Sequence, residues 1–186
     1  MLRVMDRRLS LLNAFVAALF ALTAPAQAEG DVGSLLQRLG DPELERWNRV
    51  ESRILEAWSQ SGSPAMDLLL RRGRAALEAG EVDTAIAHLT ALTDHAPDFA
   101  EGWNARAAAY YERGDYGPAM DDLARALTLN PSHFGALSGL GLILEETGRE
   151  PQALQAYRAA QAIHPHQPII SRSVARLEAR LLGRDT

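Results

Sequence analysis

The 186-residue sequence lacks both cysteine and lysine. Without cysteine the chain has no disulfide scaffold, no thiolate metal site and no thiol nucleophile. Without lysine it has no Schiff-base chemistry and no phosphate-binding loop of the kind that ends in Lys-Ser or Lys-Thr. All 19 basic residues are arginine, and against 24 acidic residues they give a net charge of −5. This balance argues against nucleic-acid binding, because such domains usually carry a basic excess.

Residues 1–28 have the three parts of a secretory signal peptide. A basic start with three arginines is followed by the uncharged and almost wholly apolar residues 9–22, and then by the small-x-small motif Ala26-Gln27-Ala28. We expect cleavage after Ala28 and export to the periplasm. Cleavage removes three arginines and one aspartate, so the mature chain has a net charge of −7. An uncleaved membrane anchor is the alternative, although the apolar run is shorter than the ~20 residues of a membrane span.

From residue 66 onward the sequence repeats a 34-residue pattern three times, over 66–99, 100–133 and 134–167. Several columns of the pattern agree in residue character, and three of them hold the same residue type in every copy. These constant columns are Gly80, Gly114 and Gly148; Ala85, Ala119 and Ala153; and Pro97, Pro131 and Pro165. Each copy therefore contains two stretches of helical length on either side of a glycine, and a proline stops the second stretch.

The second copy has the clearest helical periodicity. Trp103, Ala107 and Tyr110 recur at i, i+4 and i+7, which places them on one face of a helix. Gly114 is suited to end this helix in the left-handed conformation, and Asp115 is the expected N-cap of the next helix. Small residues at the eighth and twentieth positions of each copy predict that the two helices of a pair cross closely.

The period and the residue pattern resemble the tetratricopeptide repeat (TPR) family. The resemblance implies an all-α fold, a right-handed α-solenoid of three TPR helical hairpins with an N-terminal helical pair and a C-terminal capping helix. The expected divisions are the signal peptide over 1–28, the N-terminal pair over 29–65, the three repeats over 66–167, and the capping helix with its tail over 168–186.

Amphipathic segments flank the repeats on both sides. On the N-terminal side, residues 32–39 and 43–60 are the expected helices, with Asp41 as the N-cap and Pro42 in the first turn. We expect this pair to stack on the first repeat as an additional hairpin. On the C-terminal side, residues 168–182 have apolar residues every three or four positions, which is typical of the solvating helix after a TPR array.

No set of residues has the pattern of a catalytic or metal site. His164-Pro165-His166 brings two histidines together, but a zinc site needs a third ligand and usually i, i+4 spacing on a helix. The adjacent carboxylates Asp121 and Asp122 point about 100° apart on a helix, so they cannot flank a bond as an acid–base pair. We therefore predict a protein that is not an enzyme, with no cofactor and no metal.

The resemblance to TPR proteins also implies a concave groove, lined by set positions of the first helix of each repeat. The residues selected in this way as the partner-binding groove are Asp67, Leu70, Arg74, Glu101, Asn104, Tyr111, Ser138 and Glu145. Among them Arg74 offers a forked donor for a carboxylate, Asn104 an amide and Tyr111 an amphipathic ring. The acidic groove residues are equally compatible with a basic peptide.

These features predict a non-enzymatic protein–protein interaction module, namely a periplasmic TPR adaptor or scaffold that binds a peptide or helix of a partner in its concave groove. The alternative is a structural module that forms homo-oligomers through the N-terminal helices, whose apolar stripe includes Trp47 and Trp58. The expected partner is a protein or peptide and not a nucleic acid, with no stable membrane span after signal removal. The sequence leaves open the partner's identity and whether the N-terminal helices occupy the groove.

Overall fold

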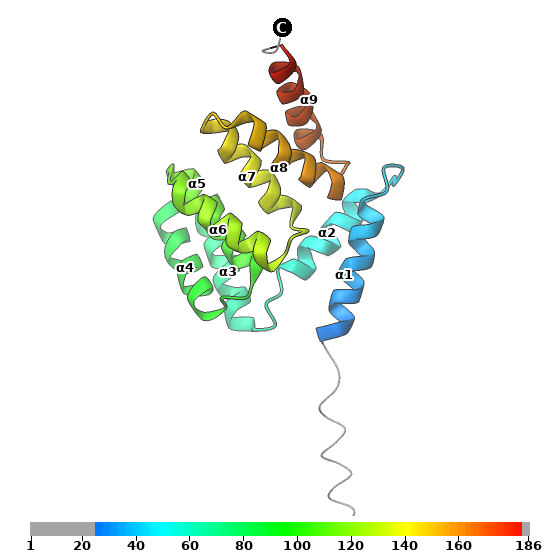
Figure 1. The fold of residues 1–186 in the computed structure, drawn as a ribbon. Coiled ribbons are helices and arrows are strands. Elements are labelled where there is room, and N and C mark those ends of the chain that lie inside the picture. The colour runs from blue at the N-terminus through cyan, green and yellow to red at the C-terminus, as the bar shows by residue number, and fades with distance from the viewer. Residues whose placement is uncertain (1–24, 184–186) are drawn as a thin grey trace, which may run out of the picture. The chain divides into compact units, whose positions relative to one another are not determined.

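A computed structural model describes residues 25–183 of the chain, with side chains from residue 31 onward. The basic start and the apolar run of the predicted signal peptide lie outside these residues. The described part contains nine helices and no strand (Figure 1). They are α1 (Pro25–Leu39), α2 (Trp47–Trp58), α3 (Pro64–Glu78), α4 (Val82–His95), α5 (Ala100–Arg113), α6 (Tyr116–Leu129), α7 (Phe134–Glu146), α8 (Glu150–Ile163) and α9 (Pro168–Leu182). The chain divides into two compact units, 1–34 and 35–186, and α2 to α9 all belong to the second.

Helices α3 to α8 form three consecutive hairpins that coincide with the three sequence repeats. A glycine follows the first helix of each hairpin in the left-handed region, with φ of +76° at Gly80, +83° at Gly114 and +74° at Gly148. The next residue then donates its N–H to the carbonyl five residues earlier, as Asp115 does to Tyr110 at 2.9 Å. This is the Schellman pattern of helix ends. The predicted all-α fold of three helical hairpins is confirmed.

Small residues at the eighth position of each repeat let the two helices of a hairpin cross closely, as the sequence predicts. A Cβ atom on Gly73 of α3 would lie 2.5 Å from Cγ of Leu89 in α4. A Cβ atom on Gly141 of α7 would lie 2.9 Å from the ring of Tyr157 in α8. Ala107 fills the equivalent position of the middle repeat and is buried. Larger side chains at these positions would force the paired helices apart.

Two predicted helix starts are wrong, both in the N-terminal pair. The first helix begins at Pro25 and not at residue 32. The second N-terminal helix begins at Trp47 and not at residue 43, because Asp41 stabilises a turn, in which its Oδ1 accepts from the N–H of Glu43 at 3.0 Å. Asp115 occupies the N-cap position of α6, as predicted, but its side chain makes no capping hydrogen bond there. Its carboxylate accepts instead from Nε of Arg113 at 2.6 Å, so an ion pair with the end of α5 replaces the expected cap.

Helix α2 packs beside the ends of the later repeats (Figure 1). Its residues Val50 and Ile54 share one buried cluster with Leu39 of α1 and Phe134 of α7, and Ile163 of α8 packs against that cluster. The expectation that the N-terminal pair stacks on the first repeat is therefore wrong for α2. The apolar stripe of α2 is instead covered by the start of α7 and the end of α8, which the 34-residue pattern alone does not place beside it.

Helix α9 packs on α8 and ends the array of hairpins, as predicted for the capping helix. Ile170, Val174 and Leu177 of α9 are buried in one cluster with Tyr157 and Ala160 of α8. Stacked repeats bury a continuous core in this way, and a terminal helix with a polar outer face covers the last of it. Within the part of the chain that the structure describes, no helix has the length and apolar character needed to cross a membrane.

Candidate functional site

Helices α5 and α7, the first helices of neighbouring hairpins, enclose a hollow that we call the α5–α7 hollow. Its volume is about 280 Å³, close to the lower end of the range for ligand pockets. The lining residues come from α5, α6 and α7, and they are Asn104, Ala107, Ala108, Tyr111, Leu123, Gly135, Gly139, Leu142 and Ile143. Apart from Asn104 and Tyr111 this lining is apolar or glycine. The hollow therefore suits an apolar side chain with polar groups beside it.

Small residues on both helices create the hollow. Gly135 and Gly139 lie one turn apart on α7, and Ala108 contributes only a methyl group from α5. A Cβ atom on Gly139 would lie 3.6 Å from the side chain of Leu123, which is an ordinary contact, so any side chain there would occupy part of the hollow. A glycine inside a helix costs about 1 kcal/mol relative to alanine. The hollow is thus maintained at some cost to the stability of α7.

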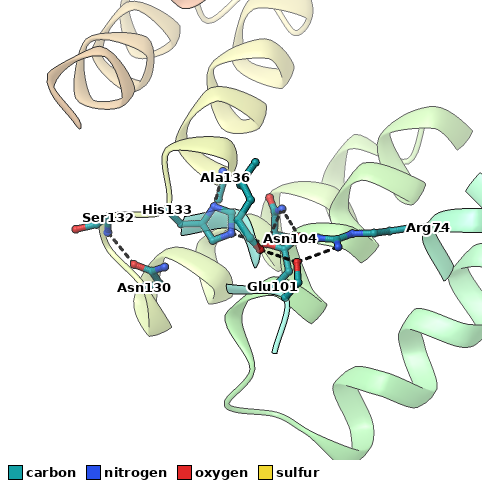
Figure 2. A network of polar contacts seen from close by, with 9 residues as sticks. Arg74, Glu101, Asn104, Asn130, Ser132, His133 and Ala136 are labelled. Carbon is teal, nitrogen blue, oxygen red and sulfur yellow. Dashed lines mark hydrogen bonds and ion pairs between the residues drawn. The ribbon is translucent and has the colours of Figure 1, made fainter. Parts of the chain in front are cut away.

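A buried polar network closes one end of this region (Figure 2). The carboxylate of Glu101, only 5% exposed, lies at its centre. Its Oε1 accepts from Nη2 of Arg74 and from Nδ2 of Asn104 at 3.2 Å, and its Oε2 lies 2.7 Å from Nε2 of His133. The network therefore joins α3 and α5 to the residue that precedes α7.

The hydrogen bonds of the network fix the protonation of its members. The N–H of Ala136 donates to Nδ1 of His133 at 3.1 Å, so this ring carries its proton on Nε2 and donates it to Glu101. Burial by itself raises the pKa of Glu101, but the hydrogen bond from His133 and the guanidinium of Arg74 more than offset it, and the pKa is lowered. Glu101 is therefore ionised at neutral pH, and Arg74 balances its charge.

The end of helix α2 covers this network. The ring of Trp58 stacks on His133, with centroids 4.5 Å apart and planes 23° apart, and Nη1 of Arg74 donates to Oγ of Ser59 at 3.0 Å. Arg74 is thus held by two groups of its own chain. The sequence left open whether the N-terminal helices occupy the groove. In the structure, the end of α2 occupies the Arg74 end of the predicted groove.

Anionic groups lie at the other end of the hollow. The hydroxyl of Tyr111 donates to Oε1 of Glu146 at 2.6 Å, and the hydroxyl of Tyr116 donates to Oε2. These two hydrogen bonds lower the pKa of Glu146, and the hydrogen bond to Glu146 raises the pKa of Tyr111. Glu112, next to Tyr111 on α5, is exposed. Glu146 is therefore ionised at neutral pH, and Glu112 is a second acidic residue beside Tyr111.

The structure brings only some of the eight predicted groove residues together. Asn104 and Tyr111 line the hollow, and Arg74 and Glu101 belong to the polar network. The remaining four are placed elsewhere or engaged within the chain. Asp67 accepts from the N–H of Ser61 at 2.7 Å, Leu70 is buried in the core, Ser138 is half-buried on α7, and Glu145 pairs with Arg176 of α9.

Several residues of the hollow were missed when the groove residues were selected from the sequence. Gly139 carries the clearest signal, since it lies four residues after Gly135 on one face of a helix. Leu123 and Ile143 are buried core residues, and they also form walls of the hollow. In the described part of the chain, no three histidine or acidic side chains lie close enough together to hold a metal ion.

Comparison with known proteins identifies a family, a relative that matches most of the chain, and solved structures with a similar fold. A profile of the tetratricopeptide repeat family matches residues 70–133 and 119–168. A TPR repeat-containing protein of Rhizobium etli is 31% identical over 174 residues, which cover 94% of this chain and 84% of that protein. The match to this relative extends over nearly the whole chain, including the segments outside the three repeats.

Solved TPR domains have a similar fold. The first TPR domain of Spaghetti (RPAP3), bound to the HSP90 peptide SRMEEVD, superposes with a TM-score of 0.62 at 22% identity, covering 64% of this chain and 95% of that domain. The Sgt2 TPR domain from Aspergillus fumigatus has a TM-score of 0.62 at 25% identity, covering 66% of this chain and 83% of that domain. The feature that these two domains share with this chain is the solenoid of helical hairpins.

Proposed function

Because the chain belongs to the tetratricopeptide repeat family, we propose that it is an interaction module without catalytic activity, an exported periplasmic adaptor that holds a peptide or helix of a partner protein. The observation that carries this proposal is the apolar α5–α7 hollow, with Asn104 and Tyr111 in its lining. A mostly apolar concavity with a few placed polar groups is the usual form of a binding site.

The proposed contacts with the partner differ from those of the whole predicted groove. Asn104 and Tyr111 contact the partner, while Leu142, which is 38% exposed in the same lining, adds apolar surface. Arg74 and Glu101 form the end wall, because each already satisfies the other and Ser59 holds the remaining arm of Arg74. A partner carboxylate would have to displace Glu101 from Arg74, so we do not assign carboxylate recognition to Arg74.

The absence of catalysis in this proposal rests on the same network. Among the described residues, two acid–imidazole pairs lie within hydrogen-bond distance, and in one of them Glu51 is 3.2 Å from the fully buried His164. Glu101 and His133 form the shorter pair and resemble a proton-transfer pair. Both are buried, with exposed fractions of 5% and 2%, and Trp58 stacks over the imidazole. A pair enclosed in this way has no access to a substrate, and its evident role is to join three helices.

A periplasmic location follows from the sequence of residues 1–28, which has the parts of a secretory signal. The proposal predicts that protein recovered from a periplasmic fraction begins at Glu29. Intact mass measurement and N-terminal sequencing test it directly. An N-terminus that retains residues 1–28 in a membrane fraction would indicate the uncleaved anchor instead.

The adaptor function is tested by filling the hollow. The Gly139→Leu substitution places a side chain against Leu123 in the lining of the hollow and raises helix propensity, by about 1 kcal/mol. The full chain, Gly139→Leu and the matched control Gly117→Leu are immobilised and exposed to periplasmic extract. Gly117 is an exposed glycine of α6 with no atom near a built Cβ. We expect a partner retained by the parent and the control and lost with Gly139→Leu, and equal retention by all three contradicts the proposal.

Self-association through the N-terminal helices has less support. The ring of Trp58 stacks on His133, and the ring of Trp47 stacks on His166 with centroids 5.8 Å apart. The apolar edge that this alternative requires is therefore engaged within one chain. A molar mass that stays constant over a wide concentration range in light scattering is the expected result, and a concentration-dependent mass would restore the alternative.

A further inference from the structure

The surroundings of the hollow also indicate which kind of peptide it takes. Resting on the proposed function, we infer that the α5–α7 hollow takes one large apolar side chain of a partner segment that also carries a lysine or arginine, within about four residues, bound by Glu112 and Glu146. The partner is therefore a basic and apolar segment. It differs in charge from the acidic peptide SRMEEVD of the similar RPAP3 complex.

The hollow selects for a single apolar side chain by its size and lining. A volume of about 280 Å³ is too small for an extended ligand and large enough for one side chain. Leu123, Leu142 and Ile143 supply apolar walls, and the glycines of α7 keep the space free. Burying an apolar side chain there is favourable by about 25 cal/mol per Å² of surface removed from water, so this contact provides the anchor.

Charge at the C-terminal ends of α5 and α7 selects for a cation next to that anchor. Glu112 is the last residue but one of α5, and Glu146 is the last residue of α7. The C-terminal ends of the two helices carry a partial negative charge, so the carboxylates add to a potential of the same sign. Among residues 31–183, neither carboxylate forms an ion pair with an arginine.

Tyr111 connects the hollow to the carboxylate of Glu146, and Glu112 is the next residue on α5. Tyr111 lines the hollow with its ring and donates its hydroxyl to Glu146 at 2.6 Å. The distance between the anchor and the cation is therefore about the length of one tyrosine side chain. Two side chains of a peptide span that distance when they lie on one face of a helix or are near neighbours in an extended segment.

Two arginines near the hollow are neutralised by ion pairs, whereas the exposed Arg149, three residues after Glu146, donates to Thr147 and Met120. Arg74 pairs with Glu101 at the opposite end, and Arg176 of α9 pairs with Glu145. An acidic peptide would therefore meet two uncompensated carboxylates and no uncompensated arginine of these pairs. The whole chain, with a net charge of −5, repels acidic peptides further.

The test is selection from random peptides displayed on phage, with the full chain immobilised and Gly139→Leu used for counter-selection. Enriched peptides are resynthesised with a fluorescent label, and their affinity is measured beside that of labelled SRMEEVD. We expect enriched peptides that combine a large apolar residue with a nearby lysine or arginine, and no binding of SRMEEVD.

A charge-matched pair of variants isolates the carboxylates. Glu112→Gln/Glu146→Gln removes two negative charges and keeps an oxygen that can accept from Tyr111. Glu56→Gln/Glu81→Gln removes the same charge at two exposed residues outside the hollow. We expect the first double variant to bind a selected peptide about tenfold more weakly, with an affinity that depends less on salt. The second double variant should change the affinity by less than about twofold.

The outcomes separate this inference from the proposed function. The inference is overturned, and the adaptor function stands, if the peptides whose binding Gly139→Leu abolishes are acidic. The same holds if the two double variants bind a selected peptide with equal affinity. Binding of SRMEEVD that Gly139→Leu abolishes has the same meaning. If no peptide is enriched on the parent relative to Gly139→Leu, the inference and the adaptor function are both overturned, because the hollow then binds no peptide.

Discussion

Trp58 at the end of α2 stacks on His133, the residue before α7, with ring centroids 4.5 Å apart. The same Trp58 ring lies 5.1 Å from the ring of Phe134. Below it, Nε2 of His133 donates to the buried carboxylate of Glu101 at 2.7 Å. One aromatic side chain from the N-terminal helices thus covers the polar network that links α3, α5 and α7, and fixes one end of the binding region.

This arrangement predicts that Trp58→Ala destabilises the whole chain. The substitution removes the stacking contact and exposes the Glu101–His133 pair to water, and we expect the free energy of unfolding to fall by about 2–3 kcal/mol. Urea unfolding followed by circular dichroism measures it. Trp58→Phe keeps an aromatic ring and should lose less than half as much. An alanine variant as stable as the parent would mean that α2 contributes little to the fold.

The repeats were predictable because their signals are local. Gly80, Gly114 and Gly148 recur at a fixed spacing, and all three adopt the positive φ that the spacing predicts. The position of α2 was not predictable in this way, since the Trp58–His133 contact joins residues far apart in the sequence. His133 has the pattern of a turn residue beside Pro131, and no local signal distinguishes a buried imidazole there from an exposed one.

The candidate site was predictable only in part, for a similar reason. Positional resemblance selected Arg74 and Glu101 as ligand-binding side chains, but it cannot show that the two bind each other. The hollow depends on side chains that are absent at Gly135 and Gly139, and repeat positions alone do not show how much space such glycines leave. Asn104 and Tyr111 were found because they are polar and also face the space that the glycines leave open.

Close helix crossing predicts that Gly73→Ala is destabilising although alanine favours helices. The new Cβ would lie 2.5 Å from Cγ of the buried Leu89, so α3 and α4 must move apart. We expect a net loss of about 1–2 kcal/mol in the free energy of unfolding. Gly117→Ala is the matched control, because nothing lies within 4 Å of its Cβ, and its stability should be unchanged or slightly raised. Equal stability of the two variants would contradict the predicted crossing.

Burial of His164 predicts a dependence of stability on pH. Burial lowers the pKa of His164 below its usual value, Glu51 of α2 opposes this effect, and His166 adds to it. The unfolded chain therefore binds a proton that the folded chain excludes, and stability falls as pH drops below about 6.5. We expect His164→Leu to reduce the slope of unfolding free energy between about pH 7.5 and pH 5.5.

The neutral stability of His164→Leu should change little. Nδ1 of His164 has no hydrogen-bond partner among the described residues, and its Nε2 lies 3.2 Å from Oε1 of Glu51. An apolar side chain of similar size removes the unsatisfied Nδ1, and Glu51 still accepts a hydrogen bond from Gln167. His95→Leu is the control, since His95 is exposed on the last turn of α4. If both variants keep the slope of the parent, another group causes the pH dependence.

The most direct test of partner binding in the α5–α7 hollow is site-specific photo-crosslinking in cells that produce the protein. Leu142 and Leu68 are each 38% exposed, but only Leu142 lines the hollow. A benzophenone amino acid is introduced at each position, and adducts are resolved by mass after irradiation. Our account predicts a discrete protein adduct from position 142 that is absent from position 68. Identical adducts from both positions, or none from position 142, would contradict it.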